Sequence, residues 1–241
     1  MWYPTRRPSV CNAHFVIPSA ERRQVIERVA GCIPAPDGGT CVRVAIDGPD
    51  ASGKTTFADE LAEDVRALGR PVARVSLDDF HNLRAVRYQQ GRESPEGFWR
   101  HAFNYARFRS DVLDPFGPGG TRQYRPAAHD LATDTELDPE PLTAPAGAVL
   151  VVDGLFLHRD ELVGVWNLSV FLDVPFTETA KRMAVRDGTD PDPEHPSVRR
   201  YMDAQRIYFN ACAPHQRADI HIDNRDVSAP RIIRAPHAQP L

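Results

Sequence analysis

The residues best suited to chemistry lie at positions 48–56, which read Gly-Pro-Asp-Ala-Ser-Gly-Lys-Thr-Thr. This order matches G-x-x-x-x-G-K-S/T, the pattern of a P-loop whose backbone N–H groups surround nucleotide phosphates. Within it, Lys54 can reach the β- and γ-phosphates, and the Thr55 hydroxyl can hold Mg²⁺. We expect a nucleotide and Mg²⁺ as cofactors, with nucleotide contacts from Gly48, Asp50, Ala51, Ser52, Gly53, Lys54, Thr55 and Thr56.

Acidic residues follow two further apolar runs. Asp78 and Asp79 come after residues 71–77, and Asp153 comes after residues 148–152. Ligands of open parallel sheets bind beyond the carboxyl ends of the strands, so these carboxylates should face the phosphates. Asp78, which we expect on the strand beside the P-loop, could accept a proton from an acceptor hydroxyl. Thr55, Asp78 and Asp153 are the expected metal ligands, and the simpler alternative is that the acids only end strands.

Arginines flank a polar segment later in the chain. Arg182 and Arg186 are four residues apart and share one helix face, and the proline-rich residues 188–196 follow. An arginine-flanked loop is the expected form of a lid that clamps phosphates and excludes water. We therefore expect a lid at residues 182–200 with Arg182 at the nucleotide; the alternative is a solvated helix pair.

Residues 82–125 interleave arginine and aromatic side chains. Most of these aromatic residues should belong to the core. An insert of this composition beside the acidic pair would also suit a pocket for a second substrate, which we expect within residues 82–146. The candidate acceptor-binding residues are Asp79, Phe80, His81, Arg92, Trp99, Tyr124 and Arg125.

The elements that would position these residues alternate between strands and helices. Apolar runs at 41–47, 71–77, 148–154, 166–174 and 218–224 predict strands, with helices from Ser19, after the P-loop, from Pro175 and from Ser197. This alternation predicts an α/β fold with a parallel sheet. We divide the chain into an N-terminal arm and helix (1–40), a P-loop domain (41–225) and a C-terminal tail (226–241).

Length, net charge and the distribution of apolar residues and cysteines narrow the class of protein further. The chain has 241 residues, enough for one α/β domain, and a net charge of −4, which gives no electrostatic footprint for nucleic acid. It contains no 18-residue apolar run, so no membrane span is expected. The scattered cysteines predict reduced thiols in a soluble, cytoplasmic protein; they are Cys11, Cys32, Cys41 and Cys212. The sequence leaves open whether the protein forms a homo-oligomer.

Two motifs of other nucleotide-binding proteins are incomplete or missing in this sequence. His158-Arg159-Asp160 imitates the catalytic triplet of protein kinases, but Val165 stands where that motif needs asparagine. The sequence also lacks the Asn-Lys-x-Asp signature of guanine recognition. ATP is therefore the expected nucleotide.

In this order, residues 48–56, 76–81, 149–154, 182–187 and 218–224 resemble the uridine kinase family of P-loop kinases over residues 42–224. The resemblance implies a five-stranded parallel sheet wrapped by helices and ATP-dependent transfer to a ribose 5′-hydroxyl. It also implies Asp78 as general base and Arg186 at the phosphates. The chain departs from the family at three positions: His81 replaces an aromatic hydroxyl, Asp153 a more frequent glutamate, and Met183 a lid arginine.

We expect a small-molecule kinase whose acceptor is a nucleoside of the uridine or cytidine kind. The nearest alternatives are P-loop kinases of pantothenate, nicotinamide riboside, or a sugar or phosphosugar. A P-loop ATPase or switch without an acceptor is the alternative of a different class. The arginine and aromatic insert argues against that class, because a switch needs no second pocket.

Overall fold

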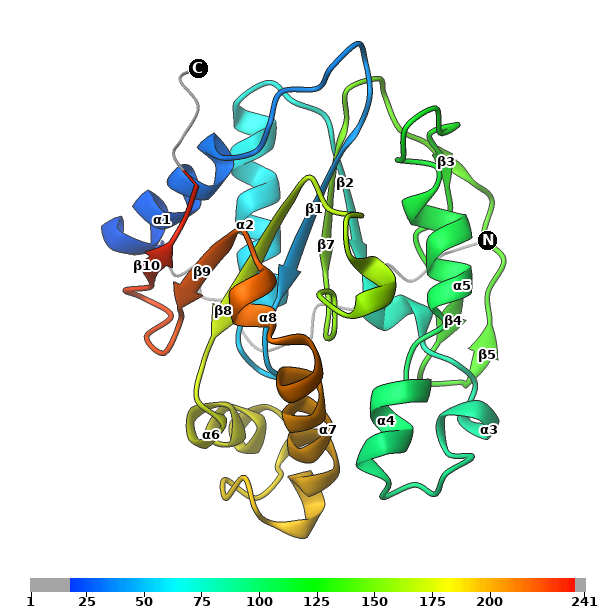
Figure 1. Cartoon of the computed structure of the whole chain (residues 1–241), viewed down its shortest axis with the longest axis vertical. Helices are drawn as coiled ribbons and strands as arrows, with labels where there is room; N and C mark the ends of the chain where they lie inside the picture. The colour runs from blue at the N-terminus through cyan, green and yellow to red at the C-terminus, as the bar shows by residue number, and fades with distance from the viewer. Residues whose placement is uncertain (1–17, 237–241) are drawn as a thin grey trace.

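The computed structural model describes residues 18–236, so Cys11, the first 17 residues of the expected N-terminal arm and residues 237–241 of the expected tail lie outside the described residues. A six-stranded sheet forms the centre, in the order β10-β9-β8-β1-β7-β2 (Figure 1). All neighbouring strands are parallel except β10, which runs antiparallel to β9. The strands are β1 (Val42–Asp47), β2 (Val72–Ser76), β7 (Val149–Asp153), β8 (Leu168–Asp173), β9 (Ile220–Asp223) and β10 (Arg231–Arg234).

The expected α/β class is confirmed, because the five apolar runs of the sequence form the five parallel strands. Two details differ from the sequence-based prediction. The sheet has a sixth strand, β10, within residues 226–241, where we expected only a tail. In addition, β7 pairs with both β1 and β2, so the strand that leads to Asp78 is not beside the P-loop strand.

Alternating side chains on the strands build two separate cores. Along β1, Val44 and Ile46 pack on the face covered by α1 (Ala20–Gly31) and α2 (Lys54–Ala67), and Ala45 packs on the other. That second face is covered by α4 (Pro95–His101), α5 (Tyr105–Phe108) and α7 (Pro196–Cys212). Every residue of β7 is buried, as expected of a central parallel strand with helices on both faces.

Local signals explain where most helices begin. Ser19 caps α1 as expected, since its hydroxyl accepts the Arg22 N–H. α7 begins at Pro196 with His195 as its cap, two residues before the expected Ser197. Helical structure between residues 95 and 113 is divided at Asn104, which donates its N–H to the carbonyl of Phe80 and caps α5 with its side chain. A π-helical turn, Arg109–Leu113, follows α5.

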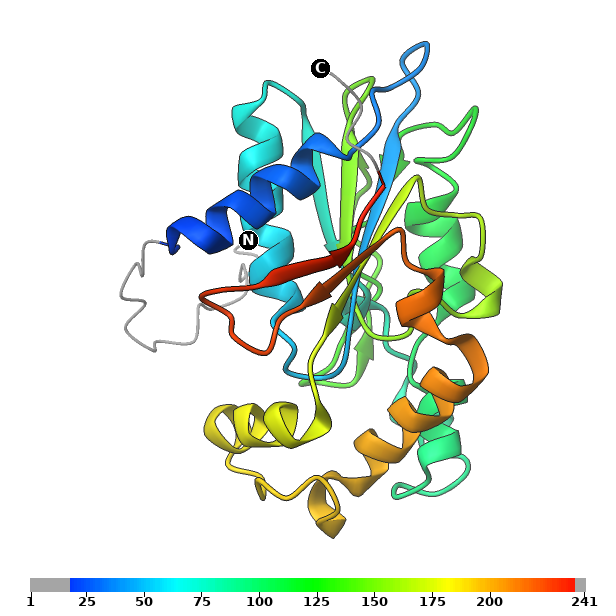
Figure 2. The ribbon, with the colours of Figure 1, turned by 60° about the vertical axis from the view of Figure 1, so that its left-hand side comes forward.

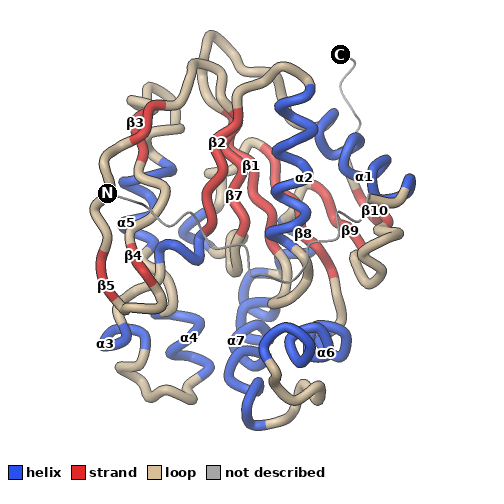
Figure 3. Tube along the Cα trace, turned by 180° about the vertical axis from the view of Figure 1, so that it is seen from behind, coloured by secondary structure: helices blue, strands red, loops and turns tan. Residues whose placement is uncertain are grey.

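The segment 82–146 lies beside the outer edge of β2 (Figure 3). Its Ala128 N–H donates to the carbonyl of Asp79, which lies within the 3₁₀ turn Leu77–Phe80 that follows β2. Besides α4 and α5 it contains α3 (Arg84–Arg87) and two small antiparallel pairs, β3 (Gln123–Tyr124) with β6 (Leu142–Thr143) and β4 (His129–Asp130) with β5 (Thr135–Glu136).

The expected lid segment spans the second half of α6 (Phe176–Asp187), a connecting loop and the start of α7. Both helices lie beyond the carboxyl ends of β1 and β8, at the lower end of the molecule in Figure 2.

The short helix α8 (Pro214–Arg217) and the turn Asp160–Leu162 complete the described elements. Within residues 18–236, no helix has the length and apolar character needed to span a membrane, and Cys32, Cys41 and Cys212 are free.

Candidate functional site

The P-loop connects β1 to α2, and it needs its two glycines for different reasons, close packing at Gly48 and backbone conformation at Gly53. A Cβ on Gly48 would lie 2.6 Å from the carbonyl oxygen of Leu172, so no side chain fits there. Gly53 has φ = 91°, a left-handed conformation that favours glycine, and it starts α2. The N–H groups at the start of α2 therefore point into the loop, where they can bind phosphate oxygens.

A cavity of about 570 Å³ opens over this loop. The Lys54 ammonium reaches over the loop and donates to the carbonyl of Pro49 at 2.7 Å. Gly48 and Ser52 belong to the loop but do not line the cavity, whereas the other expected nucleotide contacts do. The lining residues are Asp50, Ala51, Gly53, Lys54, Thr55, Thr56, Asp78, Asp153, Leu155, Arg182 and Arg186. We call this space the phosphate cavity.

Thr55, Asp153 and Arg74 form a connected group at the edge of the phosphate cavity. The Thr55 hydroxyl donates to Asp153 at 2.6 Å, and the Arg74 guanidinium lies 2.8 Å from the other Asp153 oxygen. Burial alone would raise the pKa of Asp153, but Arg74 and the Thr55 hydroxyl hold it below the usual value. Asp153 is therefore ionised. Arg74 was not among the expected site residues, although a charged residue inside an apolar strand was a signal of such a role.

The same group fits the requirements of Mg²⁺. Hydroxyl and carboxylate oxygens are the ligands that Mg²⁺ prefers, usually one or two from the protein with water and substrate phosphates completing the shell. Thr55 and Asp153 already share a hydrogen bond, and Asp78 lines the same cavity. Among the residues of the described chain, no group of three or more metal-binding side chains forms a cage of its own. A metal here would depend on the phosphates.

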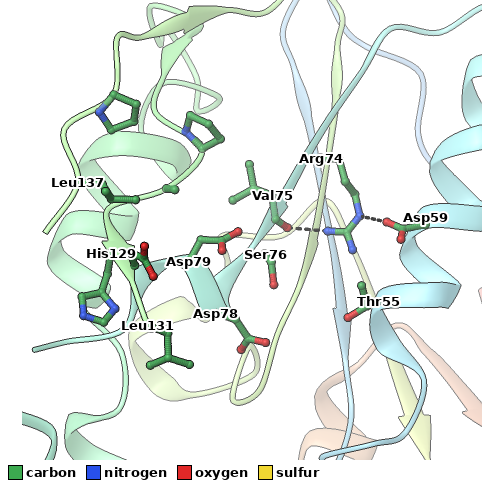
Figure 4. A pocket seen from close by; sticks show the side chains of 14 residues that line it. Thr55, Asp59, Arg74, Val75, Ser76, Asp78, Asp79, His129, Leu131 and Leu137 are labelled. Atoms are coloured by element: carbon green, nitrogen blue, oxygen red, sulfur yellow. Dashed lines mark hydrogen bonds and ion pairs between the residues drawn. The ribbon is translucent and has the colours of Figure 1, made fainter. Parts of the chain in front are cut away.

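Asp78 occupies a position shared by two cavities. It lines the phosphate cavity and also a second one of about 640 Å³, the acceptor cavity, which lies along β2 (Figure 4). Asp78 is exposed to solvent at these openings. Desolvation by the surrounding protein atoms, and next the Asp153 charge, raises the pKa of Asp78 to about 6, although Lys54 opposes the shift. Such a carboxylate can accept a proton near neutral pH.

The acceptor cavity gathers residues from α2, β2 and the segment 126–139. They are Thr55, Asp59, Arg74, Val75, Ser76, Asp78, Asp79, Pro126, Ala127, His129, Asp130, Leu131, Leu137 and Pro139. Of the candidate acceptor-binding residues, Asp79 lines this cavity. His129 and Asp130 lie within residues 82–146, where a second pocket was expected, but they were not among the candidate residues.

The remaining acceptor candidates lie elsewhere. Phe80 is fully buried and packs edge-on against Phe108, so its role is in the core. Trp99 packs against Phe156 and Tyr208. The structure places the others as follows: Tyr124 against Phe116, Arg125 in an ion pair with Asp138, and Arg92 over the ring of Tyr88.

His81 follows Asp78 closely and is tied to it. Its ring Nδ1 lies 2.7 Å from the carbonyl oxygen of Asp78, to which it donates, and the ring packs against Phe103. Burial lowers the pKa of His81 to about 4. The ring is therefore neutral at pH 7 and helps to fix the backbone at Asp78.

The two lid arginines have different partners. Arg182 donates to the carbonyls of Ala51, Asn224 and Arg225, and so joins the P-loop to the loop after β9. Asn224 itself donates to the carbonyl of Ser52 at 2.7 Å. Arg186 pairs with Asp187 and lies 3.8 Å from Asp50 of the P-loop. Both arginines reach the phosphate cavity.

A buried network joins the P-loop to α7. The carboxylate of Asp47, the last residue of β1, accepts hydrogen bonds from the Gly48 N–H, from His158 and from the Tyr208 hydroxyl. One helical turn before Tyr208, Gln205 accepts the Asp50 N–H at 2.8 Å. α7 therefore contacts the beginning of the P-loop at two points, through Tyr208 and through Gln205. Sequence patterns gave no sign of this network, because its members come from three distant segments.

Comparisons with known proteins agree with this geometry. No protein-family model and no protein of curated function matches the sequence. Among solved structures, a possible uridine kinase from Bacillus stearothermophilus aligns with 22% identity over 83% of this chain and 96% of its own, with a TM-score of 0.64. A candidate kinase of a fructose transport system from Silicibacter sp. aligns with 22% identity over 83% and 98%, with a TM-score of 0.60. D-glycerate 3-kinase from Cryptococcus neoformans gives 13% identity over 80% and 88%, with a TM-score of 0.50.

These neighbours share one fold and differ in the acceptors that their descriptions name. The chain therefore has the fold of the P-loop kinases. This is the fold that the resemblance to the uridine kinase family implied.

Proposed function

We propose that the protein is an ATP-dependent small-molecule kinase that transfers the γ-phosphoryl group to a hydroxyl of a nucleoside-like acceptor. One observation carries this proposal: Asp78 and Thr55 stand where the phosphate cavity and the acceptor cavity meet. A kinase needs its base and its phosphates at such a junction, because phosphoryl transfer depends mainly on positioning and charge neutralisation.

The donor half of the site is the P-loop. Its backbone N–H groups and Lys54 would bind the β- and γ-phosphates, and Arg182 and Arg186 would approach them from the lid segment. Thr55 and Asp153 would hold Mg²⁺, whose charge offsets that of the phosphates. The pair formed by Arg74 and Asp153 keeps that carboxylate ionised and fixed in place.

The chemical step needs one proton transfer. Asp78 would take the proton of the acceptor hydroxyl while that oxygen bonds to the γ-phosphorus and the bond to the leaving ADP breaks. A pKa of about 6 leaves Asp78 largely ionised at pH 7 yet basic enough to accept a proton. His81, held to the Asp78 carbonyl, would act as a positioning residue.

Two other functions remain as alternatives. The acceptor could be another small alcohol, such as a vitamin or a sugar, since the fold is shared by kinases of several acceptors. An ATPase or nucleotide switch without an acceptor is less well supported. A second cavity of about 640 Å³ reaches Asp78, and such a protein needs no second substrate to fill it.

The decisive assay incubates the protein with ATP, Mg²⁺ and a panel of nucleosides, vitamins and sugars, and measures ADP together with the phosphorylated product. We expect ADP formation to depend on the acceptor. If ATP is consumed at the same rate with every acceptor omitted, the kinase proposal is wrong.

A further inference from the structure

The acceptor cavity has two unlike sides. Figure 4 shows Thr55, from α2, on one side and Leu131 and Leu137, from the segment 82–146, on the other. Ser76, the last residue of β2, and Asp78 lie between them. A ligand that fills the cavity therefore meets polar side chains toward α2 and the P-loop, and apolar side chains at its opposite end.

Ser76 offers a hydroxyl group on the polar side. The residue is only 6% exposed, and its Oγ has no hydrogen-bond partner among the described residues. A buried hydroxyl without a partner costs free energy, and most buried polar groups in proteins are hydrogen-bonded. Because Ser76 lines the cavity beside the proposed base Asp78, a hydroxyl of the acceptor would complete its hydrogen bonds.

The opposite side of the cavity is formed by five apolar residues, which we call the aliphatic wall: Pro126, Ala127, Leu131, Leu137 and Pro139. Leu131 is 45% exposed and the others are half-buried, so each keeps part of its apolar surface open. A contiguous apolar surface that is bordered by polar groups is typical of a ligand-binding cleft. The aliphatic wall therefore favours a ligand whose far end is apolar.

Backbone hydrogen bonds fix the aliphatic wall to the end of β2. The Ala128 N–H donates to the carbonyl of Asp79 at 2.9 Å, and the Leu137 N–H donates to the carbonyl of Ala128 at 2.8 Å. Leu131 lies in the turn between β4 and β5, where two backbone N–H groups bind the Asp130 carboxylate. Because the fold itself sets the position of the wall, a ligand need not pay to order it.

Aromatic side chains are missing from the lining. No phenylalanine, tyrosine or tryptophan of residues 18–236 lines the cavity, and its one aromatic ring is the imidazole of His129. That side chain is only 1% exposed, so it has almost no face for a ligand to stack on. Phe80, Trp99 and Tyr124, which were expected to bind the acceptor, pack against other rings of the protein. Contact with the far end of a ligand is therefore aliphatic.

From these observations we infer that the acceptor is a two-ended alcohol, with a hydroxylated end at Asp78 and Ser76 and an apolar end that the aliphatic wall holds without ring stacking. Leu131 is the residue that selects for the apolar end. The inference rests on the proposed kinase function and adds the polarity pattern of its substrate. A free sugar is polar throughout and would leave the wall in contact with water, so it fits the cavity less well.

Three neutral acceptors that share one ribose provide the test. Methyl, cyclohexyl and phenyl β-ribofuranosides differ only in their apolar end, which is a single carbon, a saturated ring or an aromatic ring. We expect kcat/KM for the cyclohexyl compound to exceed that for the methyl compound by about 10-fold or more, because a larger apolar end fills the wall. The cyclohexyl and phenyl compounds should agree within about threefold, since stacking adds nothing.

Leu131→Ala links this preference to the aliphatic wall. The ratio of kcat/KM for the cyclohexyl compound to that for the methyl compound should fall about 3- to 10-fold, because most of one apolar side chain is lost. The KM for ATP should not change. Leu142→Ala is the matched control, because Leu142 is a similarly exposed leucine of β6 in the same segment but outside the cavity, and the ratio should stay as it is.

Ser76→Ala tests the hydroxylated end separately. Removing the Oγ takes one hydrogen bond from the ribose of all three compounds, so each KM should rise by the same factor of about 3- to 10-fold. The ratio between the cyclohexyl and methyl compounds and the KM for ATP should not change. A Ser76→Ala variant with unaltered KM values would contradict the proposed contact with the acceptor.

Binding of the three compounds, measured by calorimetry with a non-hydrolysable ATP analogue present, separates the two proposals. The inference is overturned, while the kinase function stands, if the methyl compound is phosphorylated as well as the cyclohexyl one or if Leu131→Ala leaves their ratio unchanged. A preference for the phenyl over the cyclohexyl compound of more than about threefold also overturns it. If none is phosphorylated but the cyclohexyl compound binds most tightly and depends on Leu131, the kinase proposal fails and this inference survives. Absence of binding by all three overturns it.

Discussion

The hydroxyl of Tyr208 on α7 donates a hydrogen bond to the buried carboxylate of Asp47, the residue directly before the P-loop. Asp47 also orders the first P-loop amide, since it accepts the Gly48 N–H at 2.7 Å. The helix that follows the lid segment is thereby fastened to the start of the phosphate-binding loop. A change in α7 should therefore alter nucleotide binding, even though Tyr208 lines neither cavity.

Tyr208→Phe tests this connection. The variant keeps the ring that packs against Trp99 and Phe156 but removes one donor from a buried charge, which costs about 1.5–3 kcal/mol of unfolding free energy. We also expect weaker ATP binding, because Asp47 then holds Gly48 less firmly. Chemical denaturation and titration with a fluorescent ATP analogue measure the two effects. Unchanged values in both would show that the hydrogen bond does not support the P-loop.

Lys54→Ala should remove transition-state stabilisation without unfolding the protein. Loss of one charged donor from the transferred phosphate should lower kcat/KM by about 10²- to 10³-fold, while circular dichroism stays unchanged. Lys181→Ala is the control, because Lys181 lies exposed on α6, outside the phosphate cavity, in an ion pair with Glu178. Retention of full activity in Lys54→Ala would refute the role of the P-loop.

Asp153→Asn should raise the Mg²⁺ concentration needed for half-maximal activity by about 10- to 100-fold, since a carboxylate near the metal is lost. It also leaves Arg74 with the exposed Asp59 as the one carboxylate partner that the described residues give it, so the melting temperature should fall. Mg²⁺ titrations measure the change in metal requirement, and thermal melts measure the change in melting temperature. Asp173→Asn changes the acid at the end of β8, which is separated from β7 by β1 and lies outside the phosphate cavity, and it should leave the Mg²⁺ dependence as it is.

The pKa of Asp78 predicts the pH dependence of the reaction. A general base works in its ionised form, and the pKa of Asp78 in the free protein is about 6. The kcat/KM for the acceptor should therefore rise with pH, about tenfold per pH unit below 6, and level off above about 7. The residual activity of an Asp78→Asn variant should lack this inflection; an inflection that persists there would assign the titration to another group.

Local patterns predicted the shape of the P-loop and the edge of the sheet at which two acidic residues lie. The P-loop sequence dictates its own geometry, because the steric demands at Gly48 and Gly53 and the start of α2 lie within nine residues. The rule that ligands bind beyond the carboxyl ends of parallel strands also placed Asp78 and Asp153 correctly at the same edge, where both line the phosphate cavity.

Features that depend on contacts between distant segments could not be predicted from the sequence. Strand order is one, since nothing in the run 148–154 indicates that β7 inserts between β1 and β2. The short β10 is another, because its arginine-flanked pair of isoleucines lacks a clear strand pattern. The candidate acceptor-binding residues were predicted least accurately. Phe80 and Asp79 are adjacent, and the sequence does not indicate that Asp79 lines the cavity while Phe80 fills the core.

The role of Asp78 as the base of an acceptor-dependent phosphoryl transfer is tested most directly by Asp78→Asn, assayed with ATP, Mg²⁺ and the best acceptor of the panel. We predict that kcat falls about 10²- to 10⁴-fold while the dissociation constant for ATP changes by less than about threefold. An equal loss of turnover and ATP affinity, or ATP consumption that ignores the acceptor in both proteins, would contradict it.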